Sequence, residues 1–340
     1  MVANAETYIL PNTLDSWPWK RPINPYYAKV KAEATAWMHA LQPFKNPKSQ
    51  AAFDKGEFCD DLRTGCELMF FFFIIDEYTD VEDGKVTREM IGIVRDALEH
   101  PCDPRPEGEV VLGEMTRQFW ERASQLATPS AQHHFMFQIQ RYLQAVVDQA
   151  DDRDAGRCRS VKDYLTVRRP GCGVDANQLP YEAALDIPDD VYFHAQIEEL
   201  RLHATDMSLI DNDMFSYNRE QSTGDENHNL ITVIMHERGC SLNEAFQIAA
   251  GLHMDAQRAF QEKMKSLPSW GPEIDRAVGE YVEGMAVWTR GHNQWSYECG
   301  RYFGSRGLEI QQTEVVPLLP KVNKSGRPKG DQVVVDDIPL

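Results

Sequence analysis

An eight-residue apolar run that ends directly in a cluster of carboxylates constrains the fold of this chain more than any other feature. Residues 68–75 read LMFFFFII, and residues 76–80, which follow at once, read DEYTD. Apolar side chains on every face are typical of a helix buried inside a helical bundle. Asp76 and Asp80 are four residues apart and therefore share one face of such a helix. The sequence predicts charged groups at the mouth of an apolar channel, where a cation would stabilise them. An exposed acidic helix end is the alternative.

Apolar residues recur at helical spacing along most of the chain, as in Ile274, Val278, Tyr281 and Met285. Patterns typical of strands are scarce, and the best of them is 333–335. We therefore expect an all-α fold, and the periodicity together with Pro and Gly clusters predicts these helices: 28–42, 60–78, 84–99, 108–127, 132–149, 189–220, 242–265 and 272–302.

The length of 340 residues allows two domains or one large domain. Because the helical pattern continues almost without interruption, we expect a single α-helical domain over residues 1–320. Within it, residues 8–27 contain four prolines together with Trp17 and Trp19, which predicts an extended N-terminal arm packed on the helices. Residues 321–340 are basic and Gly-containing at their start, and we expect a flexible C-terminal tail there.

Charge and cysteine usage exclude several classes of function. The 35 Lys and Arg against 53 Asp and Glu give a net charge of −18, which argues against nucleic-acid binding and against a membrane surface. No apolar stretch approaches the roughly 20 residues that span a bilayer. The N-terminus lacks the pattern of a signal peptide. Seven scattered cysteines without a CxxC pair indicate free thiols. We expect a soluble cytoplasmic protein, either a monomer or a homodimer.

A second oxygen-rich segment lies far along the chain. In 212–220, NDMFSYNRE, the residues Asn212, Ser216 and Glu220 recur every four positions and form one stripe over two helical turns. Amide, hydroxyl and carboxylate oxygens with a single formal charge suit Mg²⁺, which completes its coordination with water and phosphate oxygens. Zn²⁺ would recruit His or Cys, and the stripe contains neither. Such a stripe on its own is more often a solvated helix face.

Together the two segments resemble the metal motifs of class I terpene synthases, in particular the sesquiterpene synthases of mushroom-forming fungi. That family carries D(D/E)xxD and (N/D)Dxx(S/T)xxxE, which match 76–80 and 212–220 in order and at similar separation. An Arg-Tyr pair downstream matches Arg301 and Tyr302, and an upstream arginine that senses diphosphate matches Arg169. Arg169 is chosen over the adjacent Arg168 by its spacing from Gly173. The resemblance extends over roughly residues 8 to 315 and implies a helical bundle around a central cavity.

The resemblance also implies a role for each matched residue. Three Mg²⁺ ions would be held by Asp76, with Asp80 nearby, and by Asn212, Ser216 and Glu220. The diphosphate would be bound by Arg169, Arg219, Arg301 and Tyr302. Gly173 would stand at a helix break whose carbonyl faces the departing carbon. Two departures are Met214, in place of a more usual Leu, Ile or Val, and Cys172, where the family often has a polar linker.

A carbocation released in the cavity needs a dry, aromatic lining, because aromatic faces stabilise positive charge without admitting water. Phe72 and Phe73 lie one turn before Asp76 on its face, and Trp295 and Trp288 lie on the helix that leads to Arg301. Phe72, Phe73 and Trp295 are therefore candidates to line the cavity. Ordinary core packing is the alternative for each of them.

The resemblance implies ionisation and cyclisation of farnesyl diphosphate to a sesquiterpene hydrocarbon. The motif DEYTD and its flanks are most similar to those of Δ6-protoilludene synthases, which implies 1,11 ring closure. Another sesquiterpene product is an alternative. A chain-elongating prenyltransferase is a second alternative, although such enzymes carry two aspartate-rich motifs. A non-catalytic helical scaffold that binds a partner through its acidic surface is the third.

Overall fold

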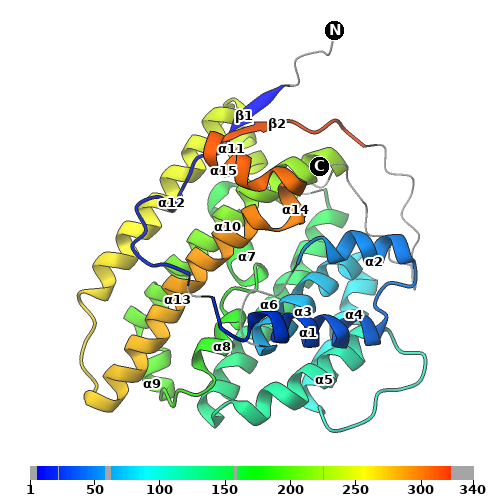
Figure 1. The fold of residues 1–340 in the computed structure, drawn as a ribbon, viewed down its shortest axis with the longest axis vertical. Coiled ribbons are helices and arrows are strands. Elements are labelled where there is room, and N and C mark those ends of the chain that lie inside the picture. Colours follow the sequence, from blue (N-terminus) through cyan, green and yellow to red (C-terminus); the bar gives the residue numbers. More distant parts are fainter. Residues whose placement is uncertain (1–5, 22, 58–62, 157–158, 225, 323–340) are drawn as a thin grey trace.

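The computed structural model describes residues 6–21, 23–57, 63–156, 159–224 and 226–322. The fold is all-α, as the sequence predicted, with one small pair of strands (Figure 1). The longer elements are α1 (Tyr27–Leu41), α2 (Pro47–Asp54), α3 (Arg63–Thr79), α4 (Gly84–Glu99), α5 (Val111–Leu126), α6 (Pro129–Asp154), α7 (Val161–Gly171), α10 (Ala195–Thr223), α11 (Leu230–Arg238), α12 (Leu242–Met264) and α13 (Pro272–Glu298). The shorter ones are α8 (Leu179–Glu182), α9 (Asp189–Tyr192), α14 (Gly300–Phe303), α15 (Gly307–Thr313), η1 (Ala176–Gln178), η2 (Glu226–His228) and η3 (Gly304–Arg306).

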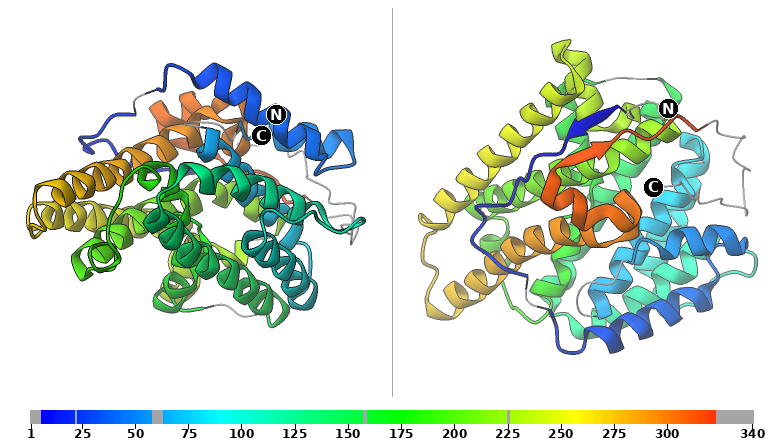
Figure 2. Two further views of the ribbon diagram at one scale, coloured as in Figure 1. Left: turned by 90° about the horizontal axis from the view of Figure 1, so that it is seen from below. Right: turned by 45° about the horizontal axis from the view of Figure 1, so that its top comes forward.

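The bundle is organised around α10, which packs against α7, α11, α12 and α13. On the other side, α3 packs against α1 and α5, and α6 packs against α4 and α7. Figures 1 and 2 show these two groups of helices enclosing the middle of the molecule. The apolar run of α3 is buried, with Leu68, Phe71 and Ile75 all at 0% exposure. The carboxylates that follow it therefore emerge from the core, as the sequence predicted.

Local sequence signals explain where the helices around the site begin and end. Asp83 caps α4 by accepting hydrogen bonds from the backbone of Lys85 and Val86. Ser241 and Glu244 form a capping box at the start of α12. Gly224 ends α10 in the left-handed conformation, with a φ of 80°.

Both ends of the described chain lie against α10, α12 and α13. Strand β1 (Thr7–Ile9) pairs antiparallel with β2 (Val315–Pro317), as the right view of Figure 2 shows. The segment after β1 runs along α12 and α13, where the buried Trp17 donates to the Ala286 carbonyl and Arg290 donates to the Trp17 carbonyl. At the other end, Val322 donates to the Ser222 carbonyl at the end of α10. Residues 323–340, most of the predicted flexible tail, lie outside the described residues.

The predicted helices correspond to α1, α3, α4, α5, α6, α10, α12 and α13, with bounds shifted by a few residues. The range 189–220 was predicted as one helix, but α9 ends at Tyr192 and α10 starts at Ala195. Five helices were not predicted, because each is short or carries few apolar residues at helical spacing: α2, α7, α8, α11 and α15. The strand signal at 333–335 lies outside the described residues.

Candidate active site

A cavity of about 470 Å³ opens in the middle of the bundle. It is lined by residues of α3, α6, α7, α10, α13 and α14 and of the loops that follow α7 and α10. The volume is within the usual range for a small-molecule site. The predicted metal-binding residues from the two distant motifs line this one cavity: Asp76, Asp80, Asn212, Ser216 and Glu220.

The α10 side of the cavity is held in place by a buried hydrogen-bond network around Asp213. The Asp213 carboxylate accepts from Arg168 on α7 at 3.0 Å, from the Tyr164 hydroxyl at 2.6 Å and from the backbone N–H of Leu230 at 3.0 Å. Arg168 also donates to the side-chain oxygen of Asn212 at 2.7 Å. Burial lowers the pKa of Arg168, but the charge of Asp213, its hydrogen bond and the nearby Tyr164 and Cys172 together outweigh that effect, and the net direction is upward. Arg168 therefore remains a cation in the cavity wall.

Asn229, the N-cap of α11, holds the end of the same motif. Its amide donates to Glu220 Oε2 at 2.9 Å and to the Asp213 backbone carbonyl at 2.8 Å. Its amide also reaches Ser216 Oγ at 3.4 Å. Burial raises the pKa of Glu220 to about 7, and the nearby Asp213 adds to this rise. The stripe of Asn212, Ser216 and Glu220 thus faces the cavity in a fixed arrangement, but with a carboxylate whose charge is poorly compensated.

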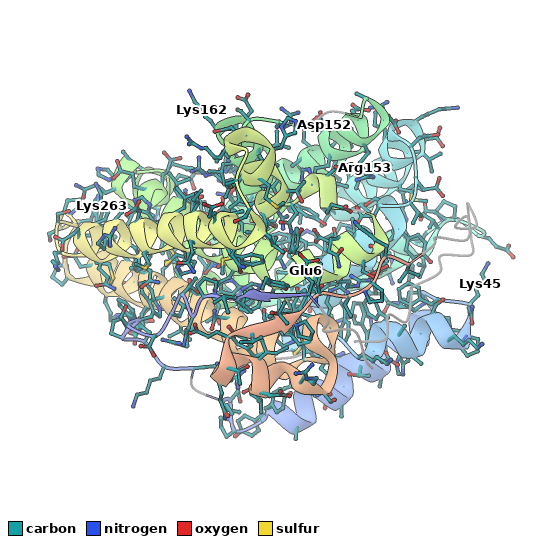
Figure 3. The ribbon with its side chains drawn as sticks, turned by 90° about the horizontal axis from the view of Figure 1, so that it is seen from above. Glu6, Lys45, Asp152, Arg153, Lys162 and Lys263 are labelled. Carbon is teal, nitrogen blue, oxygen red and sulfur yellow. The ribbon has the colours of Figure 1, made fainter. Side chains whose placement is uncertain are left out.

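The α3 side of the cavity is held less firmly. Asp76 accepts a hydrogen bond of 3.1 Å from the Tyr142 hydroxyl on α6. Burial raises the pKa of Asp76 to about 7, and the charge of Asp80 contributes further. Asp80 itself is exposed and pairs with Arg153 at 3.4 Å. Arg153 and Asp152, both labelled in Figure 3, lie at the end of α6 and line the same cavity.

Glu77 connects the α3 side to the arginines opposite it. Its Oε1 lies 3.6 Å from Arg219 on α10 and 3.5 Å from Arg301 on α14. The Arg301 guanidinium also lies over the Phe73 ring, 4.6 Å from its centroid. Tyr302 accepts a 3.0 Å hydrogen bond from the amide of Asn212. The predicted residues Arg219, Arg301 and Tyr302 thus line the cavity beside the oxygen ligands.

Arg169 lies elsewhere. Its guanidinium forms two hydrogen bonds with Asp206, at 2.7 and 3.0 Å, and Arg169 is not among the residues that line the cavity. The neighbouring Arg168 lines the cavity instead. Adjacent residues on a helix point about 100° apart, and on α7 this rotation places Arg168 at the cavity and Arg169 beside Asp206. The structure thus places Arg168, and not the Arg169 that spacing from Gly173 selected, in the cavity wall.

Gly173 occupies a position that only glycine fits. Its φ is 70°, and a Cβ atom there would lie 2.9 Å from the ring of Phe72. The residue lies in the break between α7 and η1, as the sequence predicted, and lines the cavity. Its carbonyl accepts a hydrogen bond from the backbone N–H of Asn177 at 3.0 Å.

Part of the cavity lining is aromatic and apolar. Its lining includes Phe72 and Phe73, as predicted, together with Met69, Val174 and Trp288. Trp295 does not line the cavity, contrary to the prediction. Its ring packs 5.8 Å from that of Phe73, and its Nε1 donates to the Gly56 carbonyl. Trp288, one of the two tryptophans on this face of α13, lies at the cavity instead.

The donor set fits a divalent metal ion. Asp76 and Glu220 are half-buried carboxylates whose pKa values are raised to about 7, mainly by desolvation, so a cation beside them would favour their charged forms. The converging ligand atoms are oxygens of Asp, Asn, Ser and Glu, which favour Mg²⁺ over metals that prefer nitrogen or sulfur.

Several residues of the site could not be found from the sequence. Asn229 caps a helix that was not predicted, and Asp213 lies within the 212–220 motif but was assigned no role. His292 lines the cavity with Trp288, and its Nδ1 has no hydrogen-bond partner among the described residues. Tyr142 could have been suspected, because a tyrosine in a core-facing stripe needs a partner for its hydroxyl.

Comparison with known proteins identifies the family. A family model for the C-terminal metal-binding region of terpene synthase family 2 matches residues 67–259, which include both metal motifs. The chain belongs to the terpene synthase family. It is 49% identical to Δ(6)-protoilludene synthase 18 of Postia placenta over 97% of both chains. It is 39% identical to a Δ(6)-protoilludene synthase of Stereum hirsutum, over 99% of this chain and 94% of the relative.

Solved structures of terpene synthases share the fold. Germacradien-4-ol synthase from Streptomyces citricolor superposes with a TM-score of 0.70 at 18% identity, over 82% of this chain and 98% of that one. Linalool/nerolidol synthase from Streptomyces clavuligerus gives a TM-score of 0.69 at 17% identity, over 82% and 98%. The predicted class I terpene synthase bundle is thereby confirmed. Within the part of the chain that is described, no helix combines the length and apolarity needed to cross a bilayer.

Proposed function

We propose that this terpene synthase is a cytoplasmic, Mg²⁺-dependent sesquiterpene synthase that converts farnesyl diphosphate into Δ6-protoilludene and diphosphate. The observation that carries the proposal is the convergence of both metal motifs and three arginines on one cavity with an aromatic interior. The names of the relatives, which are Δ(6)-protoilludene synthases at 39–49% identity over almost the whole chain, support the substrate and the product.

The part of the cavity that is lined by the two motifs would bind the metal ions and the diphosphate. Asp76 and the stripe of Asn212, Ser216 and Glu220 would hold three Mg²⁺ ions, with Asp80 nearby. Mg²⁺ would neutralise negative charge that develops on the leaving diphosphate. Arg168, Arg219 and Arg301 present guanidinium groups that donate to phosphate oxygens in pairs. Arg168 would take the role that the sequence suggested for Arg169, because Arg168 lines the cavity and Arg169 is paired with Asp206 outside it.

The chain's own residues would then control the carbocation. The Tyr302 hydroxyl lies close enough to Asn212 to reach the diphosphate from the same side. The faces of Phe72, Phe73 and Trp288 would stabilise positive charge, each by roughly 0.5–2 kcal/mol. The bare backbone of Gly173 brings a peptide group to the cavity surface next to Phe72. Exclusion of water by this lining would favour a hydrocarbon over an alcohol product.

Incubation of the purified protein with farnesyl diphosphate and Mg²⁺, followed by gas chromatography–mass spectrometry, tests the proposal. We expect one dominant hydrocarbon with the retention time and mass spectrum of Δ6-protoilludene. Glu220→Gln keeps the shape of the side chain but removes its charge, and it should reduce the rate by at least about a thousandfold. Another hydrocarbon would overturn only the product. A longer prenyl diphosphate formed with isopentenyl diphosphate would identify a prenyltransferase, and no turnover above Glu220→Gln would reject the enzyme.

A further inference from the structure

A second cluster of metal-ligating side chains lies far from the cavity mouth, where α6 begins. His133 and His134 are on α6 and Asp189 is the first residue of α9. His134 Nε2 lies 3.0 Å from Asp189 Oδ1, and His133 Nδ1 lies 3.1 Å from Asp189 Oδ2. One ligand atom from each of the three residues lies within 4.8 Å of the others. His134 and the cavity residue Asp152 are separated by about five turns of α6, or ~27 Å. Figure 1 shows α9 at the lower end of the molecule, away from α11 and α14.

The other nitrogen of His134 is held by a carboxylate. His134 is fully buried, its ring stacks on Tyr192 at 3.7 Å, and its Nδ1 lies 2.5 Å from Glu182 Oε1. If Nδ1–H donates to Glu182, neutral His134 presents the lone pair of Nε2 toward the Asp189 carboxylate. Two acceptors 3.0 Å apart repel each other unless a proton or a metal cation lies between them. A carboxylate on one ring nitrogen and a vacant lone pair on the other is the usual state of a metal-binding histidine.

The charges in the cluster also suit a divalent ion. Glu182 and Asp189 carry two negative charges when ionised, and both imidazoles are neutral when they bind metal. One divalent ion therefore balances the cluster without a buried imidazolium. Two imidazole nitrogens with one carboxylate oxygen favour Zn²⁺ and similar transition metals, whereas the all-oxygen set of the cavity favours Mg²⁺. The side chains of His133 and Asp189 are 58% and 56% exposed, so the ion could enter from solvent and keep a water ligand.

We propose that His133, His134 and Asp189 form a binding site for one Zn²⁺-class transition-metal ion, with Glu182 orienting His134. The ion would connect the start of α6 to α8, which carries Glu182, and to α9, which carries Asp189. The site is separate from the Mg²⁺ site of the proposed reaction and requires no substrate. Its role is to fix the start of α6 to α8 and α9.

Metal titration of the full-length protein, freed of metal with a chelator, tests the site. We expect one equivalent of Co²⁺ to produce the visible absorption of a nitrogen-ligated ion, and Zn²⁺ to bind by calorimetry with a Kd below about 10 µM. Excess Mg²⁺ should not displace either metal. His133→Gln should weaken binding by at least tenfold, and because this side chain is largely exposed the variant should fold normally.

Two controls separate this site from other sources of binding. His39 also pairs with a carboxylate, Asp54 at 3.0 Å, but this pair belongs to no cluster of three metal ligands among the described residues. His39→Gln should therefore bind Zn²⁺ like the wild type. Glu220→Gln should also retain the binding, because that residue belongs to the Mg²⁺ site. Equal affinity of wild type and His133→Gln, or no saturable binding, would overturn the proposal and leave a proton-linked histidine–carboxylate cluster.

Discussion

The two oxygen-bearing sides of the cavity differ in how firmly the protein holds them. The α10 wall, formed by Asn212, Ser216 and Glu220, is fixed by hydrogen bonds with residues outside α10. Arg168 on α7 and the α11 N-cap Asn229 donate to it, and Tyr302 on α14 accepts from Asn212. The α3 wall, formed by Asp76, Glu77 and Asp80, is supported by the Tyr142 hydroxyl and by ion pairs with arginines. The α10 wall is thus arranged before any ligand binds, whereas the cavity-facing carboxylate of Asp76 is oriented by the hydrogen bond from Tyr142.

This difference indicates that the two walls contribute differently to the binding of ions and diphosphate. A preformed wall lowers the entropy lost when ions and diphosphate bind, because its ligands already point to the right place. A loosely held wall can adjust when the substrate enters and its charge is neutralised. Glu77 connects the two walls, because it pairs with Arg219 and Arg301. Substitutions in the network behind the α10 wall should therefore affect folding, and those on the α3 wall should affect metal use.

The largest effect is expected at Asp213. Asp213→Asn removes the charge that compensates the buried Arg168 and should lower the free energy of unfolding by about 3–5 kcal/mol. Asp206→Asn breaks the matched ion pair with Arg169, which is partly exposed, and should cost less than about 1 kcal/mol. Urea denaturation of both variants measures the difference. Equal losses of unfolding free energy in the two variants would mean that the Asp213 network does not hold the α10 wall in place.

The adjacent arginines provide the next test. Arg168→Gln should lower kcat for farnesyl diphosphate by about 10²–10³-fold, because a donor to the leaving group is lost from the cavity wall. Arg169→Gln should change kcat by less than about threefold, since Arg169 contacts Asp206 outside the cavity. Circular dichroism would establish that both variants are folded at the assay temperature. A large loss of kcat in Arg169→Gln with a small loss in Arg168→Gln would instead identify Arg169, which spacing selected, as the arginine that binds diphosphate.

These two arginines also show the limit of prediction from sequence. The apolar run before Asp76 and the four-residue stripe of Asn212, Ser216 and Glu220 predicted the two metal segments, because such patterns depend on local helical geometry. The choice between Arg168 and Arg169 depends on the rotation of α7 about its axis, and α7 packs against α6, α10 and α11. That rotation comes from tertiary contacts, so spacing alone could not provide it.

Trp295 and Asn229 illustrate the same limit. Trp288 and Trp295 share one face of α13, and only the packing of α14 and the Phe73 ring determines which of them reaches the cavity. Asn229 holds Glu220 from the first residue before α11, a nine-residue helix with little periodicity. Fold class and long helices follow from repeated local patterns, whereas the supports of a site come from single residues on short elements.

A smaller effect is expected on the α3 wall. Tyr142→Phe removes the hydroxyl that donates to Asp76 at 3.1 Å and so leaves the carboxylate free to rotate. We expect the Mg²⁺ concentration for half-maximal rate to rise about tenfold, with little change in the free energy of unfolding. Tyr164→Phe is the matched control on the other wall, because Tyr164 donates to Asp213 and should affect stability more than Mg²⁺ use. A larger loss of stability in Tyr142→Phe and a larger change in Mg²⁺ requirement in Tyr164→Phe would contradict the proposed difference between the walls.

The smallest effect concerns His292, a residue of α13 that lines the cavity. Burial lowers its pKa from 6.5 to about 4, with Arg168 contributing in the same direction and Asp211 opposing it. A histidine that is harder to protonate when folded contributes stability that is present above pH 6.5 and is lost as the pH falls toward 4. Asp76 and Glu220 act in the opposite direction, because their raised pKa values favour the folded state as the pH falls through 7.

The difference in the free energy of unfolding between wild type and His292→Gln isolates the contribution of the histidine. We expect this difference in the free energy of unfolding to shift by about 0.8 kcal/mol in favour of the variant between pH 7.5 and pH 6. A difference that is independent of pH would mean that His292 is as easily protonated in the folded protein as in the unfolded chain.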